Sequence, residues 1–93
     1  MLSRVVISRS AQREAKKAPV QVRRKRALSV RSVETVGVEE VRKVPGYHDE
    51  PLHGQRAGQR SIRLSRQRRA IYVALSDGQL EFIEIQEVNP HAY

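Results

Sequence analysis

The most constraining feature of this sequence is an apolar run that ends in a turn and is followed by a second run. Residues 70–75 are continuously apolar, which is typical of a central strand covered on both faces. The pair Asp77-Gly78 is a strong signal for a tight hairpin turn. We expect the chain to return as an antiparallel strand over residues 80–88. The rest of the chain must then supply the remaining strands and a helical cover.

The first part of the chain predicts a strand and a short helix. Val5-Val6-Ile7 is bounded by polar residues and is typical of a short first strand. Either Ser8 or Ser10 can cap the helix that follows, which we expect over residues 10–17.

A second helix is predicted directly after the first. Pro19 suits the first turn of a helix, and the apolar residues that follow recur at roughly helical spacing up to about Thr35. Gly37 fits the position at which such a helix stops.

Residues 38–58 leave two interpretations open. Three valines between residues 38 and 44 could close one helical turn, or residues 41–44 could form an extended edge. Prolines and glycines interrupt the following stretch, so an ordered loop is expected from Tyr47 to Arg56. Residues 61–64 alternate polar and apolar side chains, as a half-buried strand does.

The predicted order is therefore β-α-α-β-β-β, an α+β fold in which two N-terminal helices pack on a small antiparallel sheet. A chain of 93 residues has the length of one domain, so we expect residues 1–93 to form a single unit. Leu, Ile, Val and Phe make up 24 of the 93 residues, above the roughly one-fifth below which a charged chain stays disordered.

Composition excludes several classes of protein. The sequence has no cysteine, so neither disulfides nor thiolate metal sites are possible. No apolar run approaches the ~18 residues of a membrane span, and the N-terminal apolar stretch is too short for a secretory signal. We therefore expect a cytoplasmic protein with no membrane partner.

The charge points to a polyanionic partner. Lys and Arg number 18 against 10 Asp and Glu, a net charge of +8, and 14 of the basic residues are Arg. Residues 56–69 carry six Arg and no acidic residue, whereas residues 70–93 carry four acidic residues and no basic one. Such blocks indicate a basic face that binds nucleic acid, with a merely solvated basic surface as the alternative.

Few catalytic chemistries fit the residues that remain. His48, His53 and His91 lack the short paired spacings of a zinc site, so we expect no metal and no cofactor. RNA carries its own nucleophile in the 2′-hydroxyl, so its cleavage needs only a base, a cation and an acid. Glu50, the arginines, and His91 or Tyr93 could supply these three parts.

Three stretches of the sequence carry a resemblance to a known family. Residues 45–64 (PGYHDEPLHGQRAGQRSIRL), residues 69–72 (RAIY) and the ending of residues 89–93 (NPHAY) resemble the RelE superfamily of bacterial toxins, above all its HigB-like and YoeB-like members. In element order the resemblance covers roughly residues 4–93. It implies a toxin of a type II toxin–antitoxin pair that cuts messenger RNA, generally within the ribosome.

The resemblance also implies roles for single residues. Glu50 matches the catalytic glutamate of the YoeB-like pattern, whose role is that of a base, and Arg69 matches the arginine that stabilises the transition-state phosphate. His91 and Tyr93 match the C-terminal end that supplies the general acid. Arg63 lies where the RelE branch uses a lysine as base; because a guanidinium stays protonated, Arg63 would hold phosphate and leave the base to Glu50 or a histidine.

Further contacts to RNA are expected from the same region, and one departure bears on the acid. The residues expected to bind RNA or phosphate are His53, Arg56, Arg60, Arg63, Arg66 and Arg68. The family pattern has its terminal histidine and tyrosine adjacent, whereas here Ala92 separates them; we favour His91 as the acid because its unperturbed pKa near ~6.5 suits proton transfer.

Alternative interpretations exist for the residues and for the whole protein. Glu50 could be a solvated loop carboxylate, Arg69 could form a salt bridge with Glu81 or Glu84, and His48 could simply pack in the loop. A ParE-like protein with this fold would bind DNA gyrase without cutting RNA, and a non-catalytic RNA-binding module is a third possibility. The resemblance further implies a cognate antitoxin, which in related systems also binds its own operator DNA.

Overall fold

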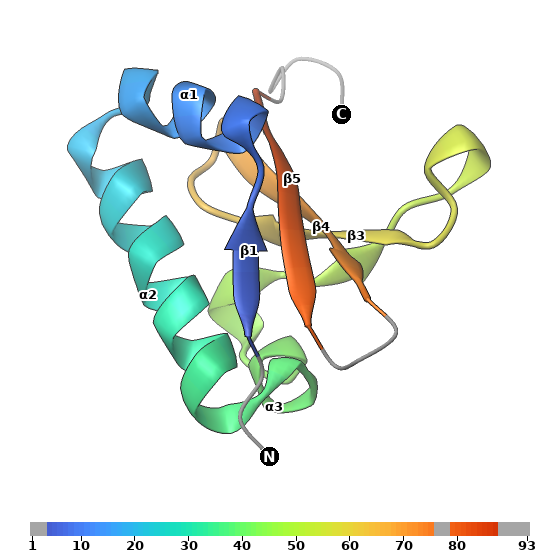
Figure 1. Ribbon diagram of the computed structural model, residues 1–93. Helices are drawn as coiled ribbons and strands as arrows, with labels where there is room; N and C mark the ends of the chain where they lie inside the picture. Colours follow the sequence, from blue (N-terminus) through green and yellow to red (C-terminus); the bar gives the residue numbers. More distant parts are fainter. Residues whose placement is uncertain (1–3, 76–78, 88–93) are drawn as a thin grey trace.

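The computed structural model describes residues 4–75 and 79–87. Its helices lie on one side of a five-stranded sheet (Figure 1). The elements in chain order are β1 (Val5–Ile7), α1 (Arg9–Lys17), α2 (Val20–Val36), α3 (Val38–Arg42), the 3-10 turn η1 (Pro45–Tyr47), β2 (Glu50–Pro51), the 3-10 turn η2 (Gly54–Arg56), β3 (Gln59–Arg63), β4 (Arg68–Ala74) and β5 (Leu80–Glu87). None of these helices has the length and apolar character that a membrane crossing needs.

The sheet confirms the predicted fold class and corrects its details. The strand order is β1-β5-β4-β3-β2, so the apolar strand β4 is central, as predicted. β2, β3, β4 and β5 pair antiparallel, but β1 runs parallel to β5. The expectation of a purely antiparallel sheet was therefore wrong for its first strand. The intervening chain crosses over through the helical layer, and this connection allows the two strands to point the same way. The predicted turn at Asp77-Gly78 lies outside the described residues.

The capping of α1 explains where this helix begins. Ser8 is the N-cap, and its side-chain oxygen accepts a hydrogen bond from the Ala11 backbone N–H at 3.0 Å. The same hydroxyl donates to the carbonyl of Ile83 at 2.9 Å, which ties the start of the helix to β5. Of the two serines that could cap the helix, Ser8 is the one that does.

The region after α2 resolves the two interpretations that the sequence left open. Gly37, at a φ of 89°, ends α2 and begins the short helix α3, so the helical interpretation of residues 38–44 is correct. The predicted loop of residues 47–56 contains an extra strand, because Glu50 pairs with Ser61 and Pro51 with Arg60. A strand of two residues is too short to produce a periodic pattern, and its proline is tolerated because β2 is an edge strand.

The core lies between the helices and one face of the sheet. Ile62, Leu64, Ala70, Tyr72, Phe82 and Ile85 form its sheet side. Ala11, Ala15, Val22, Val33 and Val41 form its helical side. The rings of Tyr72 and Phe82 pack with their centroids 6.0 Å apart. Because side chains alternate along a strand, the residues between these core positions point to the opposite face of the sheet.

Candidate active site

Two rungs of side chains cross the sheet on the face turned away from the helical core. Residues directly opposite in antiparallel strands share a face, so the pairing register shows which side chains lie together. One rung consists of Glu50, Ser61, Ile71 and Glu84. The other consists of Arg63, Arg69 and Gln86. The sheet therefore brings the predicted base and the predicted phosphate-stabilising arginine onto neighbouring rungs of one face.

These rungs open into a small cavity at the β2 end of the sheet. Its lining is one carboxylate, one imidazole, two hydroxyls and four guanidinium groups: Glu50, His48, Ser61, Ser65, Arg63, Arg66, Arg68 and Arg69. Glu50, His48, Arg63 and Arg66 are exposed, whereas Arg68 and Arg69 are half-buried. The cavity therefore presents a potential base beside a dense positive charge, in a position that solvent can reach.

The cationic pair at the centre of the cavity favours an anionic ligand. Arg63 and Arg69 lie directly opposite on β3 and β4. Like charges in this arrangement destabilise a sheet, and an anion placed between them removes the repulsion. Among the described residues, Arg63, Arg66 and Arg68 form no ion pair. Their positive charge remains available to a phosphate backbone.

A hydrogen bond to β5 holds Arg69. Its Nε donates to Oε1 of Gln86 at 2.7 Å. This neutral partner fixes the guanidinium plane without cancelling its charge, and it leaves the terminal N–H groups free to grip a phosphate. The alternative that Arg69 pairs with Glu81 or Glu84 is not what the structure shows, because Glu84 pairs with Arg56 at 2.6 Å.

A buried carboxylate anchors the segment that carries His48 and Glu50. The side chain of Asp49 is fully buried; it accepts hydrogen bonds from Nε of Arg60 at 2.5 Å and from the hydroxyl of Tyr72. These two bonds fix the position of Asp49, and both of its neighbours, His48 and Glu50, line the cavity. Asp49 was not among the predicted site residues; its position between His48 and Glu50, two potential catalytic residues, was the signal that could have revealed it.

The hydrogen-bond network around Asp49 extends to α3, and Tyr72 within this network has a raised pKa. Nε of Arg42 donates to the hydroxyl of Tyr72 at 3.4 Å. Burial raises the pKa of Tyr72 to about 12; Arg42 opposes the shift and the Asp49 carboxylate adds to it. The tyrosine therefore stays protonated at neutral pH, and its hydroxyl donates a hydrogen bond to the Asp49 carboxylate.

The backbone of His48 is unusual for a residue that is not glycine. It lies in the left-handed region, with φ 45° and ψ 47°, directly after η1. Residues other than glycine rarely adopt this backbone conformation, which here turns the chain from η1 into β2. His48 lines the cavity beside Glu50 rather than packing within the loop, so the interpretation of His48 as loop packing was wrong.

The remaining predicted residues lie at different places. Arg56 binds Glu84 and also donates to Gln59 at 2.9 Å, and Arg60 turns to the helical face and binds Asp49. His53 is exposed ahead of η2 and does not line the cavity. His91 and Tyr93 lie outside the described residues.

The described part of the chain contains no cluster of three or more His, Asp or Glu side chains that could hold a metal ion. Within residues 4–75 and 79–87, the cavity is lined by a carboxylate, an imidazole, hydroxyls and guanidinium groups. Such a set can move a proton and neutralise a phosphate.

Comparison with known proteins gives a clear result for structure alone. No protein-family model matches the sequence, and no curated protein is a significant match. Solved toxin structures match over nearly the whole chain. The RelE–RelB complex from Pyrococcus horikoshii OT3 contains a chain with a TM-score of 0.73 and 20% identity; the match covers 94% of this chain and 96% of that one.

Two further structures agree. The YoeB–YefM complex from Staphylococcus aureus matches with a TM-score of 0.71 at 15% identity, covering 96% of this chain and 100% of that chain. A YoeB/ParE toxin from Agrobacterium tumefaciens matches with a TM-score of 0.57 at 22% identity, covering 92% and 99%. The chain therefore has the fold of the RelE and YoeB toxins over almost its entire length.

Proposed function

We propose that this protein is the toxin of a type II toxin–antitoxin system and that it is a metal-independent endoribonuclease acting on messenger RNA. The observation that carries the proposal is the cavity that places Glu50 and His48 beside Arg63 and Arg69. A protein that only bound gyrase or RNA would have no need to combine a base with opposed arginines on one face. The toxin fold of the related structures supports the proposal.

The proposed reaction uses the substrate's own nucleophile. Glu50 takes the proton of a ribose 2′-hydroxyl, and the 2′-oxygen forms a bond to phosphorus while the bond from phosphorus to the 5′-oxygen breaks. The products are a 2′,3′-cyclic phosphate and a 5′-hydroxyl. Arg69, oriented by Gln86, stabilises the charge that builds on the phosphoryl oxygens, and Arg63 binds the same group from the opposite strand.

Two residues compete for the role of base, and two for that of acid. His48 and Glu50 both line the cavity. We assign the base to Glu50 because it pairs with the strand that carries Arg63, and sheet pairing fixes its position relative to the phosphate. The acid that protonates the departing 5′-oxygen is assigned to His91 or Tyr93.

The partners follow from the proposed role. Matching structures include complexes of RelE with RelB and of YoeB with YefM. We propose that this chain likewise binds an antitoxin that suppresses its activity and, in turn, binds operator DNA. Ribosome-bound messenger RNA is the proposed substrate.

The experiment that tests the function is the replacement Arg69→Ala. We expect cleavage of messenger RNA on programmed ribosomes to fall by about 10²- to 10³-fold, the usual effect of losing one donor to a developing oxyanion. Mapping of transcript 5′ ends after brief expression in bacteria gives the second readout, and cuts in frame with codons are expected. Arg13→Ala is the matched control, since Arg13 is an exposed arginine of α1 outside the cavity.

Two outcomes would contradict the proposal. Cleavage that survives in Arg69→Ala would remove the central catalytic assignment. Inhibition of DNA gyrase by the wild-type protein, without cleavage of RNA, would instead establish the ParE-like alternative.

A further inference from the structure

Two arginines are bound to neighbouring positions of β5, on the face of the sheet that carries the cavity. Arg69 donates from Nε to Gln86, and Arg56 donates from Nη2 to Oε1 of Glu84 at 2.6 Å. Glu84 and Gln86 are two residues apart in one strand, so their side chains share a face and their Cα atoms lie about 7 Å apart. The strand therefore holds Arg56 beside the arginine to which the proposed function assigns the scissile phosphate.

Arg56 differs from Arg69 because its charge is offset by its partner. Glu84 is a carboxylate, whereas the partner of Arg69 is a neutral amide. A guanidinium paired with a carboxylate has little net charge left to attract a phosphate. Arg56 is therefore less suited to a phosphate than Arg69 is.

Two hydrogen bonds fix the plane of the Arg56 guanidinium. Nη1 donates to Oε1 of Gln59 at 2.9 Å, and Nη2 donates to Glu84. The hydrogen bonds of a guanidinium lie in its plane, so these contacts from β3 and β5 leave its flat faces unused. The side chains of the ion pair are 36% exposed for Arg56 and 30% exposed for Glu84, so a ligand can reach them.

Aromatic rings that could stack on a nucleobase are scarce around the cavity. Among the described aromatic residues, Tyr72 and Phe82 are fully buried in the core. Tyr47 packs against the core, and Nζ of Lys25 lies 5.7 Å from the centre of its ring. None of these three rings lines the cavity. Proteins stack the bases of single-stranded RNA on aromatic rings or on arginine guanidinium planes, and this part of the chain offers the guanidinium.

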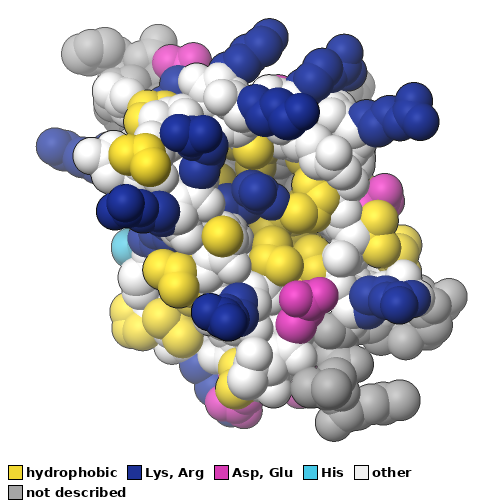
Figure 2. Space-filling view, turned by 60° about the vertical axis from the view of Figure 1, so that its left-hand side comes forward, with side chains coloured by type: hydrophobic (Ala, Val, Ile, Leu, Met, Phe, Trp, Pro, Cys, Tyr) yellow, Lys and Arg dark blue, Asp and Glu magenta, His cyan; other side chains and the backbone are white. Residues whose placement is uncertain are grey.

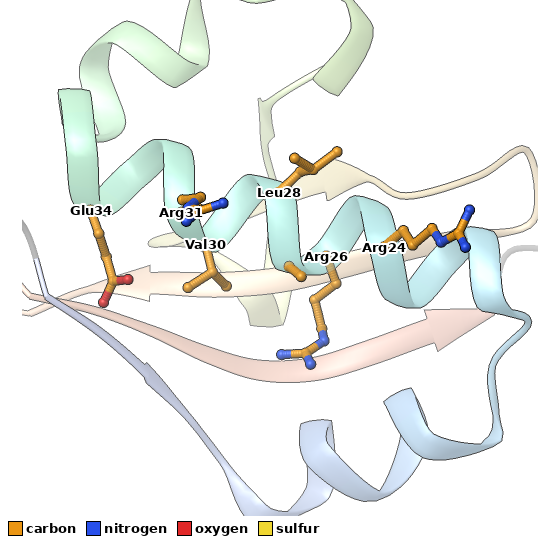
Figure 3. A pocket seen from close by; sticks show the side chains of 7 residues that line it. Arg24, Arg26, Leu28, Val30, Arg31 and Glu34 are labelled. Carbon is orange, nitrogen blue, oxygen red and sulfur yellow. The ribbon is translucent and has the colours of Figure 1, made fainter.

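The arginines of α2 do not offer such a fixed surface. Figure 2 shows many Lys and Arg side chains on the side of the molecule that carries α2, and in Figure 3 Arg24 and Arg26 project to different sides of this helix. Within the described residues, neither of them forms an ion pair. Such a side chain loses rotational freedom when it binds a ligand, whereas Arg56 is already held in place.

We infer that Arg56 and Glu84 bind the nucleobase next to the scissile phosphate, with the base stacked on the Arg56 guanidinium. The inference deepens the proposed function and rests on it for the position of the phosphate. Within the described residues, Glu84 forms its hydrogen bond through Oε1, so Oε2 can accept a bond from an amino group on the edge of the base. The site therefore favours adenine, guanine and cytosine, which carry such a group, over uracil.

A dinucleotide with one internal phosphate tests the stacking. Its single phosphate fixes the register on the cavity, and a 2′-O-methyl group on the first ribose prevents cleavage. NMR titration of the full chain compares the adenine dinucleotide with two others, in which one or the other base is replaced by hydrogen. We expect the loss of one of the two bases to weaken binding about tenfold, within the range for a stacked base.

Replacements of Arg56 separate stacking from an ion pair that only holds η2 in place. Arg56→Lys keeps a positive charge for Glu84 but has no flat group, whereas Arg56→Tyr has a flat group without the charge. We expect removal of the base to cost less than about twofold in Arg56→Ala and Arg56→Lys, and about tenfold in Arg56→Tyr. Arg13→Ala, at an exposed position of α1, is the control and should behave as the wild type does.

A replacement of Glu84 tests the preference for an amino group. Cytosine and uracil have the same size, and we expect the cytosine dinucleotide to bind about fivefold more tightly than the uracil one. In Glu84→Gln the new amide keeps an oxygen for Arg56 and turns an NH₂ group to the base, so this preference should disappear. Circular dichroism checks the folding of each variant.

The outcomes separate this inference from the proposed function. A cost of base removal that persists in Arg56→Ala or in Arg56→Lys, or that is absent from the wild type, overturns the stacking. Equal binding of cytosine and uracil by the wild type overturns the role of Glu84. Neither result depends on RNA cleavage, so a protein that cleaves RNA without this coupling disproves the inference alone, and coupling without cleavage disproves the proposed function alone.

Discussion

The arginines of the sheet and those of α2 differ in their partners. Three arginines on or beside the sheet have fixed partners, Arg69 with Gln86, Arg60 with Asp49 and Arg56 with Glu84, whereas Arg63, Arg66 and Arg68 of the cavity form no ion pair within the described residues. On α2, Arg24, Arg26 and Arg31 form no ion pair within the described residues. A guanidinium held by neighbours can meet a phosphate in one geometry, as a reaction requires. A guanidinium without such partners can adapt its position to the ligand.

The largest expected effect is a loss of RNA cleavage without a loss of RNA binding. Glu50→Gln removes the proposed base but keeps the size and polarity of the side chain. We expect cleavage to fall by about 10²- to 10⁴-fold, the range for loss of a general base, while the protein still binds RNA. Single-turnover cleavage and anisotropy measure the two quantities. Full activity in this variant would transfer the role of base to His48.

A pH experiment tests the anchor beneath the cavity. Burial raises the pKa of Tyr72 from 10.0 to about 12, so the folded chain holds the phenol proton more tightly than the unfolded chain does. The stability due to this proton is complete below pH 10 and is lost as the pH rises toward 12. The loss amounts to roughly 3 kcal/mol, since each pKa unit corresponds to about 1.36 kcal/mol.

The matched variant isolates this contribution. Denaturant unfolding of the wild type and of Tyr72→Phe at several pH values between 9 and 12 gives the difference, because all other groups are common to both proteins. We expect the wild type to lose its advantage over Tyr72→Phe across this range. Parallel stability curves would contradict a protonated, buried Tyr72.

The smallest effect concerns the orientation of Arg69. Gln86→Leu removes the acceptor for its Nε and leaves the guanidinium able to rotate. We expect kcat to fall by about tenfold with little change in KM, since a misplaced catalytic group lowers the rate rather than binding. Gln86→Asn keeps a neutral amide acceptor and should retain more activity than Gln86→Leu. Equal loss in both variants would mean that Gln86 does not act by positioning Arg69.

Strong local signals made most of the fold predictable. The continuous apolar run of β4 and the Ser8 cap are features of single segments, and both are found as expected or nearly so. β2 was missed because two residues have no periodicity. The parallel pairing of β1 with β5 was missed because pairing direction depends on a connection through the whole helical layer.

The site was predictable in a more limited way. The resemblance singled out Glu50, Arg63 and Arg69, and the register brings these three to one cavity. The partners of the arginines were not predictable, because Asp49 and Gln86 act through contacts between strands that are far apart in sequence. The position of Arg60 was not predictable for the same reason. Only the strand register shows that its side chain lies on the opposite face of the sheet from Arg63 and Arg69.

A single extra residue in β5 determines which side chain lies opposite Arg69. Tyr72 pairs with Phe82 but Ile71 pairs with Glu84, so Ile83 has no partner and forms a bulge. If Ile83 paired with Ile71 instead, the register of Tyr72 would continue and would set Ile85 opposite Arg69 and Glu84 opposite Ala70, where the core requires an apolar group. The bulge at Ile83 therefore keeps hydrophobic residues on the inner face of the sheet while it gives the outer face Gln86, the side-chain amide that binds Arg69.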